Sequence, residues 1–162
     1  MGFELIRGRP NRLKSDNTFH PTRHSTSKST LLIESYDGVD LMLFWYTEYI
    51  ELPFHFSNIE VFPVLVAADE VPDRLKHLGY ITENGFSGYE LKTDSASFLI
   101  ISGVCEFMSR PEAEAREEGL KFDDRWISLY DGLSVKERRI EAAKVGGPLA
   151  YAQLQREQLG DY

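Results

Sequence analysis

Short apolar runs separated by turn residues occupy the first two thirds of the chain, which is typical of β-strands. The run 30–36 is a candidate strand, and Asp37-Gly38 after it is a strong signal for a two-residue hairpin turn. The next run, 39–50, is apolar at nearly every position, which predicts a central strand covered on both faces. Pairing around the turn would set Glu34 opposite Leu41.

Two further apolar runs continue this strand pattern. The run 59–67 contains Pro63, which favours an edge strand or a bulge because proline has no N–H to donate. The run 97–108 contains Gly103, which indicates a bulge or the close approach of another backbone. Between them, Asn84-Gly85 is a second hairpin signal.

Helix signals are concentrated in the last third of the chain. One short helix is expected earlier, over 71–79, with a proline in its first turn and a glycine at its end. Serine followed three residues later by glutamate is a capping box, and it opens expected helices at 109–119 and at 134–145. A last helix, 148–159, follows a Gly-Gly break.

This order of elements predicts the fold class. Strands that come before helices favour a single α+β domain with an antiparallel or mixed sheet. We expect about five or six strands within residues 30–108, followed by C-terminal helices packed on the sheet.

The N-terminal segment differs from the rest in composition. Residues 1–30 contain six basic and two acidic residues, and apolar residues are scarce after Ile6. We expect residues 1–28 to form a basic polar arm or loop and residues 29–162 to form the domain. A basic arm can touch nucleic acid, but six cations without a stacking array of aromatic residues do not predict a nucleic-acid partner.

Composition bounds the class of protein. The chain has 162 residues, a formal net charge of −8 and 42% hydrophobic residues. It is not collagen-like, coiled-coil, disulfide-rich or disordered throughout, and no apolar run approaches the length of a membrane-spanning helix. With no signal-like N-terminus and a single cysteine, Cys105, we expect a cytoplasmic protein in which that thiol is buried and inert.

Three histidines occur in tripeptides of the form His-x-Thr/Ser: His20-Pro-Thr22, His24-Ser-Thr26 and His55-Phe-Ser57. Paired on facing strands, such tripeptides resemble the catalytic signature of the 2H phosphoesterases. The resemblance implies that each histidine moves a proton and each hydroxyl holds the phosphate. It covers only these tripeptides, and the spacing before the third is shorter than usual. Ordinary surface histidines are the alternative.

A second resemblance involves acidic residues. Pro72-Asp73 followed by Glu90-Leu91-Lys92 is similar to the pattern of the PD-(D/E)xK nucleases. The resemblance implies that Asp73 and Glu90 hold Mg²⁺ while Lys92 orients the attacking water. Asp73 should then begin a strand, whereas its surroundings predict a helix. Glycine-rich phosphate loops and a nucleophile elbow are missing, and we expect no metal and no cofactor.

The remaining feature is an acidic run. Residues 106–124 contain seven acidic and three basic residues. Such a run is either a solvated face or a surface for a basic partner, because complementary charge speeds encounter and fixes specificity. The candidate partner-binding residues are Glu112, Glu114, Glu117, Glu118, Asp123 and Asp124. Trp126 beside them is a candidate anchor or, more simply, a core residue.

These features favour a non-catalytic cytoplasmic binding protein. Its profile is similar to that of immunity proteins and phage inhibitors of host defences, by analogy of composition. We expect it to occlude a basic protein partner with its acidic face. The alternatives are a small phosphoesterase or metal-dependent nuclease of unfamiliar pattern, and a viral or phage assembly subunit with a basic arm. Self-association is left open.

Overall fold

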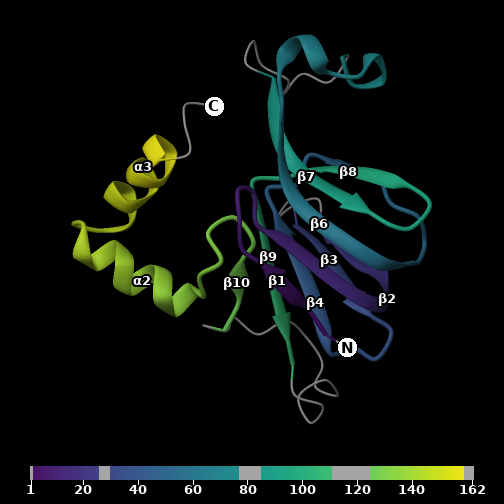
Figure 1. The fold of residues 1–162 in the computed structure, drawn as a ribbon, viewed down its shortest axis with the longest axis horizontal. Helices are drawn as coiled ribbons and strands as arrows, with labels where there is room; N and C mark the ends of the chain where they lie inside the picture. Colours follow the sequence, from purple (N-terminus) through teal and green to yellow (C-terminus); the bar gives the residue numbers. More distant parts are fainter. Residues whose placement is uncertain (1, 26–29, 77–84, 111–124, 159–162) are drawn as a thin grey trace.

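The computed structural model describes residues 2–25, 30–76, 85–110 and 125–158. These residues form ten strands, two short 3-10 helices and two α-helices (Figure 1). The strands are β1 (Glu4–Ile6), β2 (Arg12–Ser25), β3 (Thr30–Ser35), β4 (Asp40–Trp45), β5 (Tyr49–Ile50), β6 (Phe56–Val66), β7 (Phe86–Lys92), β8 (Ser97–Ile101), β9 (Val104–Ser109) and β10 (Ile127–Ser128). The helices are η1 (Ala68–Glu70), η2 (Asp73–Leu75), α2 (Val135–Lys144) and α3 (Pro148–Gln158).

The strands form one antiparallel sheet that closes on itself. Its strand order is β10-β9-β4-β3-β2-β6-β7-β8-β5, with β1 on β2. β5 continues β4 after a break at 46–48, and β9 continues β8 after a break at 102–103. β4 pairs with β9, and β5 pairs with β8. The segment β4–β5 therefore pairs along its length with the segment β8–β9, and this pairing closes the sheet. One face of the sheet is therefore enclosed.

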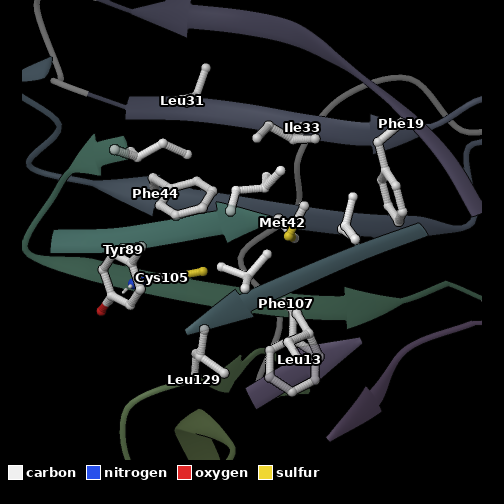
Figure 2. Packing of buried hydrophobic residues seen from close by; sticks show 14 of the residues in the cluster. Leu13, Phe19, Leu31, Ile33, Met42, Phe44, Tyr89, Cys105, Phe107 and Leu129 are labelled. Atoms are coloured by element: carbon white, nitrogen blue, oxygen red, sulfur yellow. Dashed lines mark hydrogen bonds between the residues drawn. The ribbon is translucent and has the colours of Figure 1, made fainter. Parts of the chain in front are cut away.

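The enclosed face holds the main hydrophobic core. Alternate residues of each long strand point inward, as the two-residue period of a strand requires. Figure 2 shows these side chains meeting from opposing strands. The buried members of this cluster are Leu13, Phe19, Leu31, Ile33, Met42, Phe44, Phe56, Ile59, Val61, Tyr89, Leu91, Ile100, Cys105, Phe107 and Leu129.

Two smaller clusters cover parts of the outer face. One contains Leu32, Leu41, Leu43, Met108 and Trp126. Trp126 is only 4% exposed, so in this structure it is a core residue. The other cluster contains Val71, Leu75, Phe86 and Ile101, which join η2 to β7 and β8. These clusters explain why 39–50 and 97–108 are apolar on both alternating faces.

The predicted α+β class with an antiparallel sheet is confirmed, but the expected number of strands was too low. Two apolar runs that looked like single strands each divide in two, because Tyr46 adopts a left-handed backbone (φ 56°) and Ser102-Gly103 interrupts the other run. The two breaks face each other, since the Gly103 N–H donates to the Trp45 carbonyl at 3.1 Å. β1, β2 and β10 lie outside residues 30–108.

Local signals predicted the first hairpin in detail. Glu34 pairs with Leu41, as counting from the turn indicated. Gly38 has φ 73°, and its N–H donates to the Ser35 carbonyl at 2.8 Å. Pro63 pairs with Tyr89 on β7, and β6 has already left β2 at Val61, so the missing N–H of Pro63 costs no β2–β6 hydrogen bond.

The described part of residues 1–28, which we expected to be an arm or loop, supplies β1 and β2 instead. β2 lies in the middle of the sheet, between β3 and β6. Its inward positions include Leu13 and Phe19, both with no exposed surface. A register shift between Ser15 and Thr18 breaks the alternation, and the outward positions are polar. The alternation of apolar and polar residues that marks a strand is therefore not visible in the sequence of β2.

The helices also differ from expectation. Residues 71–76 contain the 3-10 helix η2 rather than an α-helix, and the rest of that predicted helix lies outside the described residues. So does the 109–119 helix beyond Arg110. In Figure 1, α2 begins beside β10 and α3 lies farther from the sheet. Of the side chains described in these two helices, only Ala142 is buried, so the helices do not cover the sheet.

A carboxylate fastens η2 to the corner of the sheet. Arg74 donates to both carboxylate oxygens of Glu51, from Nε at 3.0 Å and from Nη2 at 3.2 Å. The Tyr49 hydroxyl donates to the same carboxylate at 2.7 Å, and the Leu99 N–H donates at 3.3 Å. Desolvation alone raises the pKa of Glu51, but the hydrogen bonds from Arg74 and Tyr49 outweigh it and lower the pKa below its usual value.

This lowered pKa predicts a pH-dependent stability. The ionised Glu51 stabilises the fold above about pH 4.3, the ordinary glutamate pKa, and this contribution is lost as the pH falls through the lower folded-state pKa. We expect Glu51→Gln to lower the free energy of unfolding at neutral pH and to remove this part of its acid dependence. The free energy of unfolding, measured with urea at several pH values from neutral to acidic, tests both effects. Glu70→Gln, at an exposed position on η1, is the matched control. The same dependence of unfolding free energy on pH in wild type and in Glu51→Gln would contradict the prediction.

Candidate functional site

The helix pair α2–α3 is defined by local signals at each end. Ser134 caps α2, and its hydroxyl accepts a hydrogen bond from the Glu137 N–H at 3.1 Å, as the capping box predicted. Gly146 and Gly147 both have positive φ, 101° and 121°, which turns the chain after α2. Pro148 then begins α3, where its fixed φ suits the first helical turn.

The helix pair carries large apolar side chains that the rest of the molecule leaves uncovered. Leu149 is 86% exposed and Ile140 is 51% exposed. Val145 is 41% exposed and Leu154 is 38% exposed. Exposed apolar side chains are normal when scattered singly, whereas four within the fifteen residues 140–154 indicate an interaction surface.

The base of the pair is held to the sheet by charged groups. The Arg138 guanidinium on α2 lies 3.9 Å from a Glu106 carboxylate oxygen on β9 and 3.9 Å from an Asp131 oxygen. Burial raises the pKa of Glu106, although Arg138 opposes this. Burial and the neighbouring Asp131 raise the pKa of Tyr151 on α3. These contacts place the helix pair beside β9 and β10.

Sequence reasoning missed this cluster. Glu106, Asp131 and Arg138 are spread over more than thirty residues and form no motif. The capping box correctly predicted that a helix begins at 134–135. It carries no information on which strand that helix adjoins, so no local signal marks the cluster.

The structure brings two of the three histidine tripeptides to neighbouring strands. Thr18 pairs with Ser57 and Phe19 pairs with Phe56, where the β2–β6 ladder ends, and His20 and His55 each lie next to this last pair. The His20 ring stacks on Tyr36 with centroids 4.5 Å apart.

The other members of this group have different surroundings. The Thr22 hydroxyl donates to the Glu34 carboxylate at 3.1 Å. His24 pairs with Leu31, farther along β2. His20 therefore lies on β2 and His55 lies immediately before β6, and Thr22 is already engaged by a carboxylate.

The residues of the nuclease pattern have separate partners. Asp73 lies on η2 and forms an ion pair with Lys76 at 2.8 Å. Glu90 and Lys92 share one face of β7, as that chemistry needs, but Glu90 accepts from Ser97 and Lys92 lies over the Phe62 ring at 5.3 Å. Within the described ranges, no three His, Cys, Asp or Glu side chains converge as a metal site requires.

The acidic candidates Glu112, Glu114, Glu117, Glu118, Asp123 and Asp124 lie outside the described residues. Their part in partner binding stays a prediction from sequence. Glu106 and Arg110 of the same run are described. Glu106 faces Arg138, and Arg110 donates to the Gly38 carbonyl at 2.6 Å, so both have structural roles.

No helix in the described part of the chain is both long and apolar enough to cross a membrane. Comparison with protein-family models, with curated protein sequences and with solved structures finds no match to the chain.

Proposed function

We propose that this chain is a non-catalytic binding protein of the inhibitor class, which recognises a protein partner through the helix pair α2–α3. The observation that carries this proposal is the exposure of Ile140, Val145, Leu149 and Leu154 on two helices that do not cover the sheet. The centre of a protein interface is built from such side chains, because their burial removes apolar surface from water.

Charge supports a basic protein as the partner. The chain carries a formal net charge of −8, so two copies repel each other at long range, whereas a basic protein is attracted. The acidic residues of 112–124 precede the helix pair in sequence, and we propose that they speed the encounter. Apolar contacts on the helix pair then supply the affinity. Bound in this way, the protein would occlude an active site on its partner.

Replacing Leu149 by aspartate tests the proposal. We expect capture of the partner from native cytosol, through a wash of about 0.5 M salt that screens surface charge, to fall to background, because a charge at a buried contact must be desolvated. Phe54→Asp is the matched control, since Phe54 is 93% exposed but lies before β6 and away from the helix pair. Unchanged capture by Leu149→Asp, or equal loss in both variants, would contradict the proposal.

The acidic run is tested separately. The charge-reversal variant Glu114→Lys/Glu117→Lys/Glu118→Lys should slow association with the captured partner and leave dissociation nearly unchanged. An unchanged association rate would remove these residues from the proposal. Capture of the same chain alone would replace the basic partner with a second copy.

Two of the histidine tripeptides lie at the same end of the β2–β6 ladder, and this placement favours a phosphoesterase as the second candidate. In that case His55→Ala would abolish phosphodiesterase activity that the parent protein shows. A parent protein without such activity against a panel of phosphodiesters would exclude this candidate.

A further inference from the structure

A cleft opens where the closed sheet divides. β7 pairs with β8 as far as Tyr89 opposite Ile100, and beyond that point β9 pairs with β10 instead. In Figure 1, β6 and β7 extend past the other strands at this end. The space between has a volume of about 570 Å³, within the range of roughly 300–1,000 Å³ that small-molecule sites occupy.

Two walls of this cleft are tied to each other. Asn11 is 8% exposed, and its side-chain amide donates to the carbonyls of Leu129 at 3.1 Å and Tyr130 at 3.2 Å. Its side-chain oxygen accepts from the Gly8 N–H at 3.0 Å. The loop that carries Arg9 is therefore held at a set position against the segment 128–131, which lines the cleft opposite β6 and β7. Such preorganisation lowers the entropic cost of binding.

Two guanidinium groups line the cleft, although the whole molecule is acidic. The lining includes Arg9 and Arg138 but only one carboxylate, Asp131. Arg9 is exposed and forms no ion pair with any residue in the described ranges. The Nε atom of Arg138 is buried and has no hydrogen-bond acceptor among those residues. The nearest carboxylate oxygens, at 3.9 Å, are too far away for a hydrogen bond.

The other side of the cleft is apolar. Pro63, Val64 and Leu65 of β6 line it, and Leu65 is 47% exposed. The exposed guanidinium of Arg9 beside a hydrophobic wall suits a ligand that has a negatively charged oxygen group on an apolar body. A bare inorganic ion would leave the hydrophobic wall in water.

We propose that this cleft binds a small organic anion, with its phosphate or carboxylate group on Arg9 and Arg138 and its apolar body against β6. This site is separate from the outer apolar surface of the helix pair, so it stands independently of the proposed function.

Titration calorimetry with phenyl phosphate and with phenylacetate tests the proposal and distinguishes the two anionic groups. We expect saturable binding of at least one of them. Inorganic phosphate and benzyl alcohol should each bind about tenfold more weakly or not at all, since one lacks the apolar body and the other lacks the charge. Failure of both aromatic anions to bind, or equal binding by benzyl alcohol, would overturn the proposal.

Variants locate the site. Arg9→Gln should weaken binding of the better ligand about tenfold or more, because it removes a charge-assisted contact from an exposed loop residue whose loss does not threaten the fold. Arg138→Gln should do the same, with circular dichroism to confirm that α2 persists. Arg23→Gln, at an exposed position on β2 away from the cleft, is the control and should bind like wild type. Wild-type affinity in Arg9→Gln would overturn the assignment. Leu149→Asp should leave anion binding unchanged.

Discussion

Replacing Phe44 by alanine is expected to lower the free energy of unfolding by about 3–5 kcal/mol, the usual cost of removing a fully buried phenyl ring. Phe44 has no exposed surface and lies on β4 inside the closed sheet. Its ring meets Tyr89 edge to face, with centroids 5.7 Å apart. Strands surround this position on all sides, so the walls cannot collapse into the cavity, and the cost should lie at the upper end of that range.

Urea or thermal unfolding measures this effect. At a few degrees per kcal/mol for a domain of this size, the midpoint temperature should fall by roughly 10 °C. Phe54→Ala makes the same chemical change at a side chain that is 93% exposed, and it should change stability by less than about 0.5 kcal/mol. If the two variants were destabilised equally, Phe44 would not lie in a closed core.

The Cys105 thiol is expected to react with a disulfide reagent about 10³-fold or more slowly in the native protein than in the unfolded chain, because access requires an opening of the fold. Cys105 is fully buried on β9. Burial, assisted by Glu106, raises its pKa well above the usual range, so little reactive thiolate forms. Tyr89 lies beside Cys105 in the core (Figure 2), and the Cys105 N–H donates to the Tyr89 hydroxyl at 3.2 Å.

Absorbance measures the rate at which the thiol reacts with the reagent. The rates in buffer and in concentrated urea give the ratio of native to unfolded reactivity. The Phe44→Ala variant provides an internal test, because its smaller free energy of unfolding should raise the native rate if reaction proceeds through global opening. A native rate close to that in urea would show that the sheet is open at β9.

The candidate residues show how far sequence patterns reach. The histidine tripeptides suggested two facing strands, and His20 and His55 lie next to the last pair of the β2–β6 ladder. That juxtaposition depends on β2 and β6 being neighbours, which their sequence separation does not reveal. Arg9, Asp131 and Arg138 line one cleft, although nothing in their local sequence relates them, because the cleft forms where the pairing of β7 with β8 ends and β9 pairs with β10 instead.

The sequence by itself determined the local elements: the hairpin at Asp37-Gly38 with Glu34 opposite Leu41, the Ser134 cap of α2, and the break before Pro148. These depend on neighbouring residues and on backbone preferences that need no partner. Only the tertiary structure decided that β2 lies in the middle of the sheet and that the long apolar runs bend into two strands each. Closure of the sheet and the exposure of the helix pair were decided in the same way. Those features depend on which distant segments exclude water from one another. The free energy of burial is non-directional, so the sequence of one segment does not show which other segment will cover it.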